Sequence, residues 1–234
     1  GRRSADAVRK LYQPTGRIRA VLFDFDDTLT KRDLSFAGSC RLFLQRHFPM
    51  LDGAALDDAV GKLTAASRHG YLPYDRAAYD DLCKVHDVAV PFEEFLRFLQ
   101  VGYPVSTTVV ADARPTLETL RRKGLKLGVV TNGSAIIQNR KLDISGLRPL
   151  LDSVTVGGEE AIDKPEAAVF ERAAMRLGVP PADCLFVGDN VKNDIEGSLD
   201  AEMQAVFVDH GYSDFPLTRP VPRIRALTEL LRLI

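Results

Sequence analysis

Three carboxylate side chains stand within four positions, directly after a run of apolar residues. The run is Val21-Leu22-Phe23, and the carboxylates are Asp24, Asp26 and Asp27. Such a run is typical of a strand buried on both faces of a parallel sheet. Charged groups are rarely buried without partners, so we expect the strand to end at Asp24, at an accessible edge. There the carboxylates would repel one another unless a cation such as Mg²⁺ joined them, although any turn can be rich in aspartate.

Two further apolar runs also end in polar residues. Gly128-Val129-Val130 is followed by Thr131, and Leu185-Phe186-Val187-Gly188 is followed by Asp189. In a parallel sheet with helices on both faces, ligands bind beyond the carboxyl ends of the strands. We therefore expect Asp24, Thr131 and Asp189 to lie at one edge of such a sheet.

The elements that would position these residues alternate between strand and helix from residue 111 onward. Predicted strands cover Arg19–Phe25, Leu125–Thr131, Ser153–Val156, Cys184–Gly188 and Gln204–Val208. Predicted helices cover Pro115–Lys123, Ser134–Leu142, Pro165–Leu177 and Arg223–Leu233. This alternation predicts an α/β fold with a doubly wound parallel sheet.

The segment between the first strand and this alternating part has helical spacing throughout. The predicted helices are one that contains Leu42 and ends at Pro49, followed by Leu56–Arg68, Arg76–His86 and Phe92–Gln100. We therefore predict three parts of the chain. They are an N-terminal arm (1–17), a core (18–31 and 111–234) and an inserted all-helical domain (32–110).

Composition limits the class of protein. Of 234 residues, 45% are hydrophobic and 27% are charged, which supports a large folded core. The net charge of −1 provides no basic surface for nucleic acid or an anionic membrane. The three cysteines lack metal-binding spacing, and no apolar stretch has the length of a transmembrane helix. We expect a cytoplasmic monomer or homodimer that binds neither nucleic acid nor membrane.

The polar segments resemble the four motifs of one protein family, in the same order. Asp24-Phe25-Asp26-Asp27-Thr28 matches Asp-x-Asp-x-Thr, the first motif of the haloacid dehalogenase superfamily, most of whose members are phosphatases. Thr131-Asn132-Gly133 resembles the second motif, Lys164-Pro165 the third, and Gly188 to Asp194 the fourth. The resemblance covers about residues 19 to 210. It implies a Rossmann-like core and identifies the helical insertion as a cap domain.

The resemblance implies four catalytic residues. Asp24 would attack phosphorus and form an aspartyl-phosphate. Asp26 would protonate the leaving alkoxide and then take a proton from the attacking water, which requires a pKa above the ordinary value for aspartate. The Thr131 hydroxyl suits a phosphate oxygen, and Lys164 would supply positive charge to the anionic intermediate.

The resemblance also implies a Mg²⁺ site. Asp24 and Asp189 would bind the ion through their carboxylates, and Asp26 through its backbone carbonyl. We include Asp194 in the metal site as well, acting through water or by positioning Lys164.

Substrate contacts are expected from two places. Asn132 and Gly133 begin the helix after the second strand, where backbone N–H groups suit phosphate. The polar break between two helices of the insertion offers His69, Tyr71, Tyr74 and Arg76. His210 has no partner pattern and is expected to be structural or to face solvent.

Two positions depart from the family pattern. Asp27 and Glu202 stand where glycine is common in the family. Aspartate tolerates turn conformations, so the change at Asp27 carries little weight. Glutamate at a helix end is expected to cost some stability.

These features predict a Mg²⁺-dependent phosphatase for a small phosphate monoester. The candidate substrates implied by the resemblance are sugar phosphates, nucleoside monophosphates and phosphoglycolate. A phosphomutase with the same motifs is an alternative. A 2-haloacid dehalogenase is disfavoured by Asp26, because a halide leaves without a proton. A non-catalytic binding protein that retains the fold is the alternative from a different class.

Overall fold

The computed structural model of the protein describes residues 16–66, 75–211 and 215–234, and these form two compact units. The core unit contains the described residues up to Leu29, together with Val110–Ala135 and Leu147–Ile234. The helical unit contains the described residues of Thr30–Val109 and also Ile136–Gly146. The predicted division at residues 31/32 and 110/111 stays a prediction, and 136–146 groups with the helical unit although it falls inside the predicted core range.

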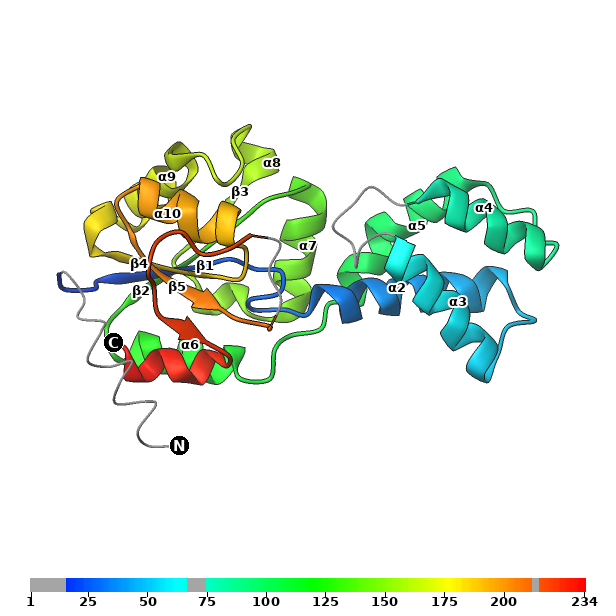
Figure 1. The fold of residues 1–234 in the computed structure, drawn as a ribbon, viewed down its shortest axis with the longest axis horizontal. Helices are drawn as coiled ribbons and strands as arrows, with labels where there is room; N and C mark the ends of the chain where they lie inside the picture. The colour runs from blue at the N-terminus through cyan, green and yellow to red at the C-terminus, as the bar shows by residue number, and fades with distance from the viewer. Residues whose placement is uncertain (1–15, 67–74, 212–214) are drawn as a thin grey trace. The chain divides into compact units, whose positions relative to one another are not determined.

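The core unit is built on a six-stranded sheet in the order β3-β2-β1-β4-β5-β6, with every neighbouring pair parallel (Figure 1). The strands are β1 (Ala20–Phe23), β2 (Lys126–Thr131), β3 (Ser153–Val156), β4 (Cys184–Gly188), β5 (Gln204–Val208) and β6 (Arg223–Ile224). Strands β2 and β3 follow on one side of β1, and strands β4, β5 and β6 follow on its other side. The strand order therefore reverses next to β1, which is where sheets of this type bind ligands.

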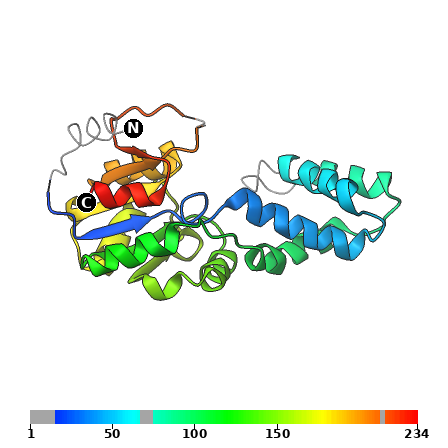
Figure 2. The same ribbon diagram turned by 90° about the horizontal axis from the view of Figure 1, so that it is seen from below.

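Helices cover both faces of the sheet, as Figures 1 and 2 show. Those of the core unit are α6 (Ala113–Arg122), α8 (Gly157–Glu160), α9 (Ala167–Leu177), α10 (Gly197–Asp200), the π-helical turn η4 (Val191–Glu196) and the 3₁₀ segments η2 (Arg148–Leu150), η3 (Pro181–Asp183) and η5 (Leu227–Arg232). Helix α9 packs on β1, β2 and β3, and α6 packs against η5 and β2. The Phe170 ring of α9 meets the Phe186 ring of β4 edge to face, with centroids 5.0 Å apart. Strand β1 is thus fully buried, as its apolar run predicts.

The helical unit has an aromatic core of its own. Its helices are α2 (Arg32–His47), α3 (Gly53–Ala66), α4 (Arg76–Val85), α5 (Phe92–Val105) and most of α7 (Ala135–Ser145). The Phe43 ring lies 6.0 Å from that of Tyr79 and 4.9 Å from that of Phe95 between centroids. The Lys141 ammonium of α7 lies 4.5 Å from the centre of the Tyr103 ring of α5, a cation–π contact.

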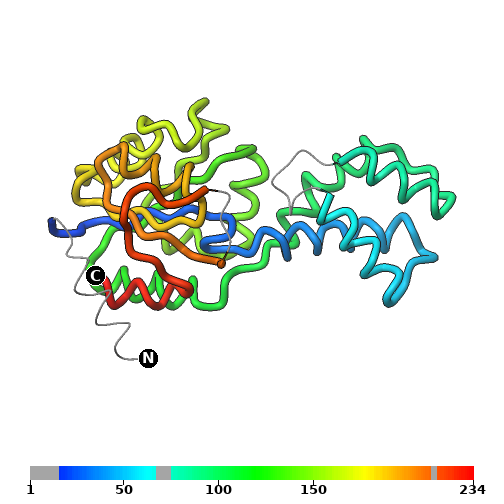
Figure 3. The backbone as a smooth tube through the Cα atoms, viewed as in Figure 1, coloured from blue at the N-terminus to red at the C-terminus, as the bar shows by residue number. Residues whose placement is uncertain are grey.

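The chain leaves the core unit and returns to it along two adjacent segments, which can be followed in Figure 3. On the core side, the Val110 N–H donates to the Leu29 carbonyl over 3.0 Å. On the side of the helical unit, Thr30 and Val109 form an antiparallel bridge. The insertion is therefore closed at its base by hydrogen bonds between its own two ends.

The predicted fold class is confirmed, and β3, β4 and β5 have the predicted bounds. The prediction of one helix over Arg223–Leu233 is wrong. Its first two residues form β6, in which buried Ile224 pairs with Val208, and a short 3₁₀ helix follows. A two-residue edge strand has no alternation that a sequence pattern could reveal. In the described part of the chain no helix combines the length and apolar character needed to cross a membrane.

The two positions that depart from glycine both have left-handed backbone, with φ of 63° at Asp27 and 61° at Glu202. Glu202 follows α10, and the N–H groups of Glu202 and Met203 donate back to the carbonyls of Leu199 and Ser198. Helix ends of this kind favour glycine, because other residues pay a steric penalty there.

Replacing Glu202 by glycine is therefore expected to stabilise the protein by about 0.5 to 1 kcal/mol, after the greater chain entropy of glycine is counted. The measurement is the free energy of unfolding in urea. Glu171→Gly is the matched control: this exposed residue lies inside α9, so glycine there should destabilise by about 1 kcal/mol. Equal effects of the two changes would contradict the explanation.

Candidate active site

Two neighbouring strands bring Asp24 and Asp189 to the edge where the strand order reverses. Asp24 follows β1, and its backbone N–H donates to the Val187 carbonyl of β4 over 2.9 Å, so the pairing continues one residue past the strand. Strand β4 ends at Gly188, and Asp189 comes next. Strand β1 ends at Phe23, whereas the predicted strand ended at Phe25. Asp24 is therefore the first residue beyond the strand. This placement is what the apolar runs predict for the two carboxylates.

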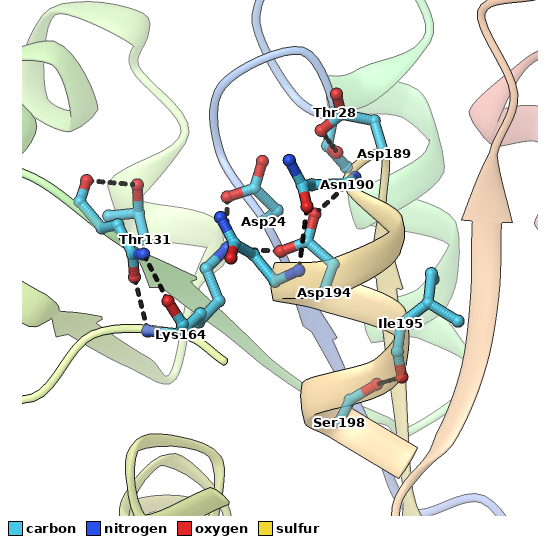
Figure 4. A network of polar contacts seen from close by, with 11 residues as sticks. Asp24, Thr28, Thr131, Lys164, Asp189, Asn190, Asp194, Ile195 and Ser198 are labelled. Atoms are coloured by element: carbon cyan, nitrogen blue, oxygen red, sulfur yellow. Dashed lines mark hydrogen bonds and ion pairs between the residues drawn. The ribbon is translucent and has the colours of Figure 1, made fainter. Parts of the chain in front are cut away.

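The Lys164 ammonium lies between two carboxylates. Its Nζ is 2.6 Å from Asp24 Oδ1 and 2.7 Å from Asp194 Oδ1, and all three side chains are buried (Figure 4). The segment before α9 thus delivers one positive charge to the edge of the sheet. An ion pair this deeply buried needs such close contacts, because little solvent stabilises its charges.

The Asp194 carboxylate is fixed by the turn that follows β4. Its Oδ1 accepts from Lys164, and its Oδ2 accepts from the Asn190 N–H over 2.9 Å. The Asn190 side chain in turn accepts from the Asn193 N–H over 2.8 Å at the start of η4. Gly188 leaves room for this carboxylate, since a Cβ at that position would lie 2.5 Å from Asp194 Oδ2. The glycine of the fourth motif is therefore required by close packing.

Lys164 is also held through its main chain. The Asn132 side chain accepts from the Lys164 N–H over 2.8 Å and donates to the Lys164 carbonyl over 2.9 Å. Both ends of the Asn132 amide are thus paired with the residue that carries the ammonium. The prediction that Asn132 binds substrate stays a prediction, and any such contact would come on top of this pairing. The pairing joins residues 32 positions apart, and no sequence spacing signals it.

The carboxylates could hold a metal ion. Oxygens of Asp24, Asp189 and Asp194 all lie within 4.8 Å of one another. Ligands on opposite sides of a Mg²⁺ ion are about 4.2 Å apart, so this oxygen set fits the ion after small adjustments. The set differs from the predicted one, because Asp26 is not part of this group of side chains. The backbone carbonyl of Asp26, which is the predicted ligand atom, is not tested by side-chain positions.

Burial and charge set the protonation of the ion pair. Burial raises the pKa of Asp24 to about 6, against the lowering effect of the Lys164 charge. Burial acts to lower the pKa of Lys164, but the charges of Asp194 and Asp24 outweigh it and raise that pKa. Lys164 is thus a permanent cation at neutral pH, while Asp24 can bind a proton in mildly acidic solution.

The remaining predicted core residues lie at the same edge. Thr131 is the last residue of β2 and is 2% exposed, on the Lys164 side of Asp24 in Figure 4. Gly133 has left-handed backbone with φ of 108°, and its carbonyl accepts from Gly158 over 3.2 Å. Asp26 is 7% exposed, in the turn that follows β1. These three positions agree with the predicted edge, and their roles stay predictions.

The predicted contacts from the insertion divide into two groups. His69, Tyr71 and Tyr74 lie outside the described residues. Arg76 is exposed at the start of α4, where it pairs with Asp80 and Glu93 and covers the Phe92 ring. Its guanidinium is therefore engaged within the helical unit.

The fold and the site together define a class of protein: a Rossmann-like α/β protein with a lysine and three carboxylates gathered where its strand order reverses. A family model described as haloacid dehalogenase-like hydrolase matches residues 18–201, which is most of the chain. The protein belongs to this haloacid dehalogenase superfamily, in its phosphatase branch.

Individual relatives agree with this membership. N-acylneuraminate-9-phosphatase of Mus musculus is 28% identical over 226 residues, which cover 88% of this chain and 88% of that protein. Glyceraldehyde 3-phosphate phosphatase of Methanothermobacter thermautotrophicus is 37% identical over 198 residues, covering 82% of this chain and 85% of that protein. The crystal structure of a haloacid dehalogenase-type phosphatase from Thermococcus onnurineus matches with a TM-score of 0.61 and 29% identity, over 92% of this chain and 97% of that one.

Proposed function

We propose that this phosphoric monoester hydrolase is a Mg²⁺-dependent phosphatase that works through an aspartyl-phosphate on Asp24. The observation that carries the proposal is the position of Lys164, 2.6 Å from Asp24 and 2.7 Å from Asp194, beside a group of oxygens that fits a divalent ion. A carboxylate attacks a phosphate ester only where nearby positive charge offsets the repulsion between two anions. The ammonium supplies part of that charge directly at the attacking group.

Asp24 has one oxygen available for the attack. Its Oδ1 accepts from Lys164, and in the part of the chain that the structure describes Oδ2 receives no hydrogen bond. Bond formation from this carboxylate to phosphorus breaks the bond to the ester oxygen, which leaves as an alkoxide and needs a proton. Asp26 is the proposed donor, because it lies two residues from Asp24 in the turn that follows β1 and is buried at the same edge of the sheet. It then accepts a proton from the water that hydrolyses the aspartyl-phosphate.

We assign the Mg²⁺ ligands to Asp24 and Asp189, with the backbone carbonyl of Asp26. Asp194 is assigned the role of orienting Lys164, because both of its oxygens already accept hydrogen bonds from the protein. When bound, the ion would neutralise phosphate charge and orient the ester toward the nucleophile.

The proposed substrate is a small organic phosphate monoester, of the sugar phosphate, nucleoside monophosphate or phosphoglycolate type. The names of two relatives, N-acylneuraminate-9-phosphatase and glyceraldehyde 3-phosphate phosphatase, specify small organic phosphates. Residues 32–110 are the proposed cap that selects the substrate and excludes water during the reaction. A cytoplasmic location and a monomeric or dimeric state remain predictions from composition.

The experiment that tests the proposal measures phosphate release from a panel of small phosphate esters, with Mg²⁺ and with EDTA in its place. Turnover of at least one ester that requires the metal is the expected result. Halide release from short haloacids, measured in parallel, should be absent. No turnover on any ester at millimolar Mg²⁺ would reject the proposal.

Mg²⁺ is expected to bind more weakly in acid, because it competes with the proton on Asp24. The pKa of that carboxyl is raised to about 6 in the folded protein, so the apparent dissociation constant should rise about tenfold for each pH unit below 6. In the metal-free protein the raised pKa stabilises the folded state below the unfolded value of 3.8, and this contribution is lost as pH rises through about 6. Mg²⁺ should therefore raise the Tm strongly at pH 7.5 and weakly at pH 5.

Scanning calorimetry with and without Mg²⁺ at the two pH values checks this prediction. Asp24→Asn is the control, since the variant has no carboxyl to titrate at this position. In this variant Mg²⁺ should raise the Tm less than in the natural protein, and the size of the Tm shift should depend less on pH. Equal Tm shifts of the natural protein at pH 5 and pH 7.5 would contradict the prediction.

A further inference from the structure

A histidine outside all four motifs contacts the turn that carries Asp26. His210 lies two residues beyond the end of β5, and its Nε2 is 2.6 Å from the backbone carbonyl oxygen of Asp27. A carbonyl oxygen only accepts hydrogen bonds, so Nε2 carries the proton and donates it. Sequence spacing predicts no partner for His210, because the two residues are 183 positions apart.

The turn after β1 is held by contacts within itself and with the segments that follow β4 and β5. It is closed on itself by the Leu29 N–H, which donates to the Phe25 carbonyl over 2.9 Å. Directly after β4, the Asp189 carboxylate accepts a hydrogen bond from the Thr28 hydroxyl over 3.4 Å. The contact from His210 adds an attachment to the segment that follows β5, the strand next to β4 in the sheet. These hydrogen bonds join the turn to neighbouring segments at the carboxyl end of the sheet, where Asp24 and Asp189 lie.

The contact from His210 falls on the one strained residue of this turn. Asp27 has left-handed backbone with φ of 63°, a conformation that costs residues other than glycine free energy. Its carbonyl belongs to the peptide that joins Asp27 to Thr28, and Asp26 directly precedes it. A hydrogen bond to that carbonyl restrains rotation of this peptide and so holds the turn in the conformation that includes the left-handed Asp27. Loss of this restraint would loosen the turn that joins Asp26 to Thr28, whose hydroxyl contacts Asp189.

We propose that His210 is a positioning residue that holds the turn so that Asp26 can deliver its proton to the leaving group. The inference rests on the proposed function, because it assumes that Asp26 is the proton donor. It assigns His210 no contact with substrate. Its expected effect is therefore confined to the two steps in which Asp26 transfers a proton, and kcat/KM reports only the first of them, the departure of the leaving group.

A leaving-group comparison tests this role more sharply than activity alone. An alkyl phosphate expels an alkoxide that requires a proton, whereas p-nitrophenyl phosphate expels a stable phenolate that does not. We expect His210→Leu to lower kcat/KM for the alkyl phosphate about ten- to a hundredfold, the usual range for partners that orient a reacting group. For p-nitrophenyl phosphate the same variant should change kcat/KM by less than about threefold, because no proton transfer is involved.

His210→Gln is the matched variant, because its amide N–H reaches about as far as Nε2 and cannot act as an acid. It should restore the rate on the alkyl phosphate to within about threefold of the natural protein, as expected where a donor has only to orient a group. Equal losses on the two substrates, or a glutamine variant no better than leucine, would overturn the inference. Unfolding in urea shows that the compared variants are folded at the assay temperature.

The failure of this inference is distinguishable from failure of the proposed function. The natural protein is assayed first for Mg²⁺-dependent release of phosphate from both esters. Absence of that activity rejects the phosphatase itself. Activity that is unchanged in His210→Leu rejects only the positioning role.

Discussion

Asp24→Asn protein is expected to release phosphate at least about 10⁴-fold more slowly than the natural protein, the size of loss seen when a catalytic nucleophile is removed. The amide oxygen of asparagine is a poor nucleophile, and it cannot form the acyl-phosphate bond. Lys164 keeps its contact with Asp194 in this variant, so the protein should still fold. The measurement is phosphate release at saturating Mg²⁺, together with a search for labelled phosphoenzyme after rapid acid quench.

The control for this variant is Asp81→Asn, which neutralises an exposed carboxylate of α4. Its turnover should match that of the natural protein. Mg²⁺-dependent release that persists in Asp24→Asn would assign the nucleophile to another group. Loss of phosphoenzyme labelling together with loss of turnover would support Asp24.

Lys164→Met is expected to reduce both the stability and the activity of the protein. The change removes a buried cation and leaves the carboxylates of Asp24 and Asp194 close together without it. Breaking a buried ion pair in this way typically costs about 3 to 5 kcal/mol. Turnover should fall by about a thousandfold or more, since the attacking carboxylate loses its positive partner.

The pH dependence of the stability loss identifies its cause. Without the ammonium, the pKa of Asp24 rises further above its value of about 6, so the folded variant binds a proton more tightly than the unfolded chain does. The stability difference from the natural protein should therefore be larger at pH 7.5 than at pH 5, because it narrows as pH falls from the variant's higher pKa to about 6. Urea unfolding of both proteins at pH 5 and pH 7.5, in the absence of metal, measures this stability difference.

Lys192→Met provides the matched control, because this lysine lies in the same motif as Asp189 but is exposed. A surface substitution of this kind should change the unfolding free energy by no more than about 0.5 kcal/mol. A loss below about 1 kcal/mol in Lys164→Met would show that the buried pair contributes little.

The parts of this protein that sequence reasoning could predict are those encoded locally. Apolar runs located the buried strands, and the polar residues that end them marked the edge occupied by Asp24, Thr131 and Asp189. Strand β6 was missed because two residues carry no periodicity, and the buried Leu230 after it belongs to a short 3₁₀ helix within an apparent helical stripe. A periodic pattern thus identifies a helix or strand only where the element is long enough for the pattern to repeat.

The contacts that hold the site in place could not be predicted in the same way. The Asn132 amide pairs with the main chain of Lys164, and His210 donates to Asp27, across separations of 32 and 183 residues. A motif specifies which groups react, whereas these bonds depend on how distant loops meet after folding. Asn132 was predicted to bind substrate because it stands where the helix after the second strand begins, and the structure shows that its side chain pairs with the main chain of Lys164.

Residues 136–146 belong to the helical unit although they lie outside the insertion (32–110). Replacing the insertion by another domain would therefore also affect these residues. The two ends of the insertion are joined by hydrogen bonds at its base, so excision would leave a gap that a short linker could close. Yet Ile137 of α7, a helix that connects β2 to β3, packs against the aromatic cluster of the insertion. A chain stripped of the insertion would expose that side of α7 to water. Grafting a foreign insertion at this point would therefore require redesign of the face of α7 that carries Ile137.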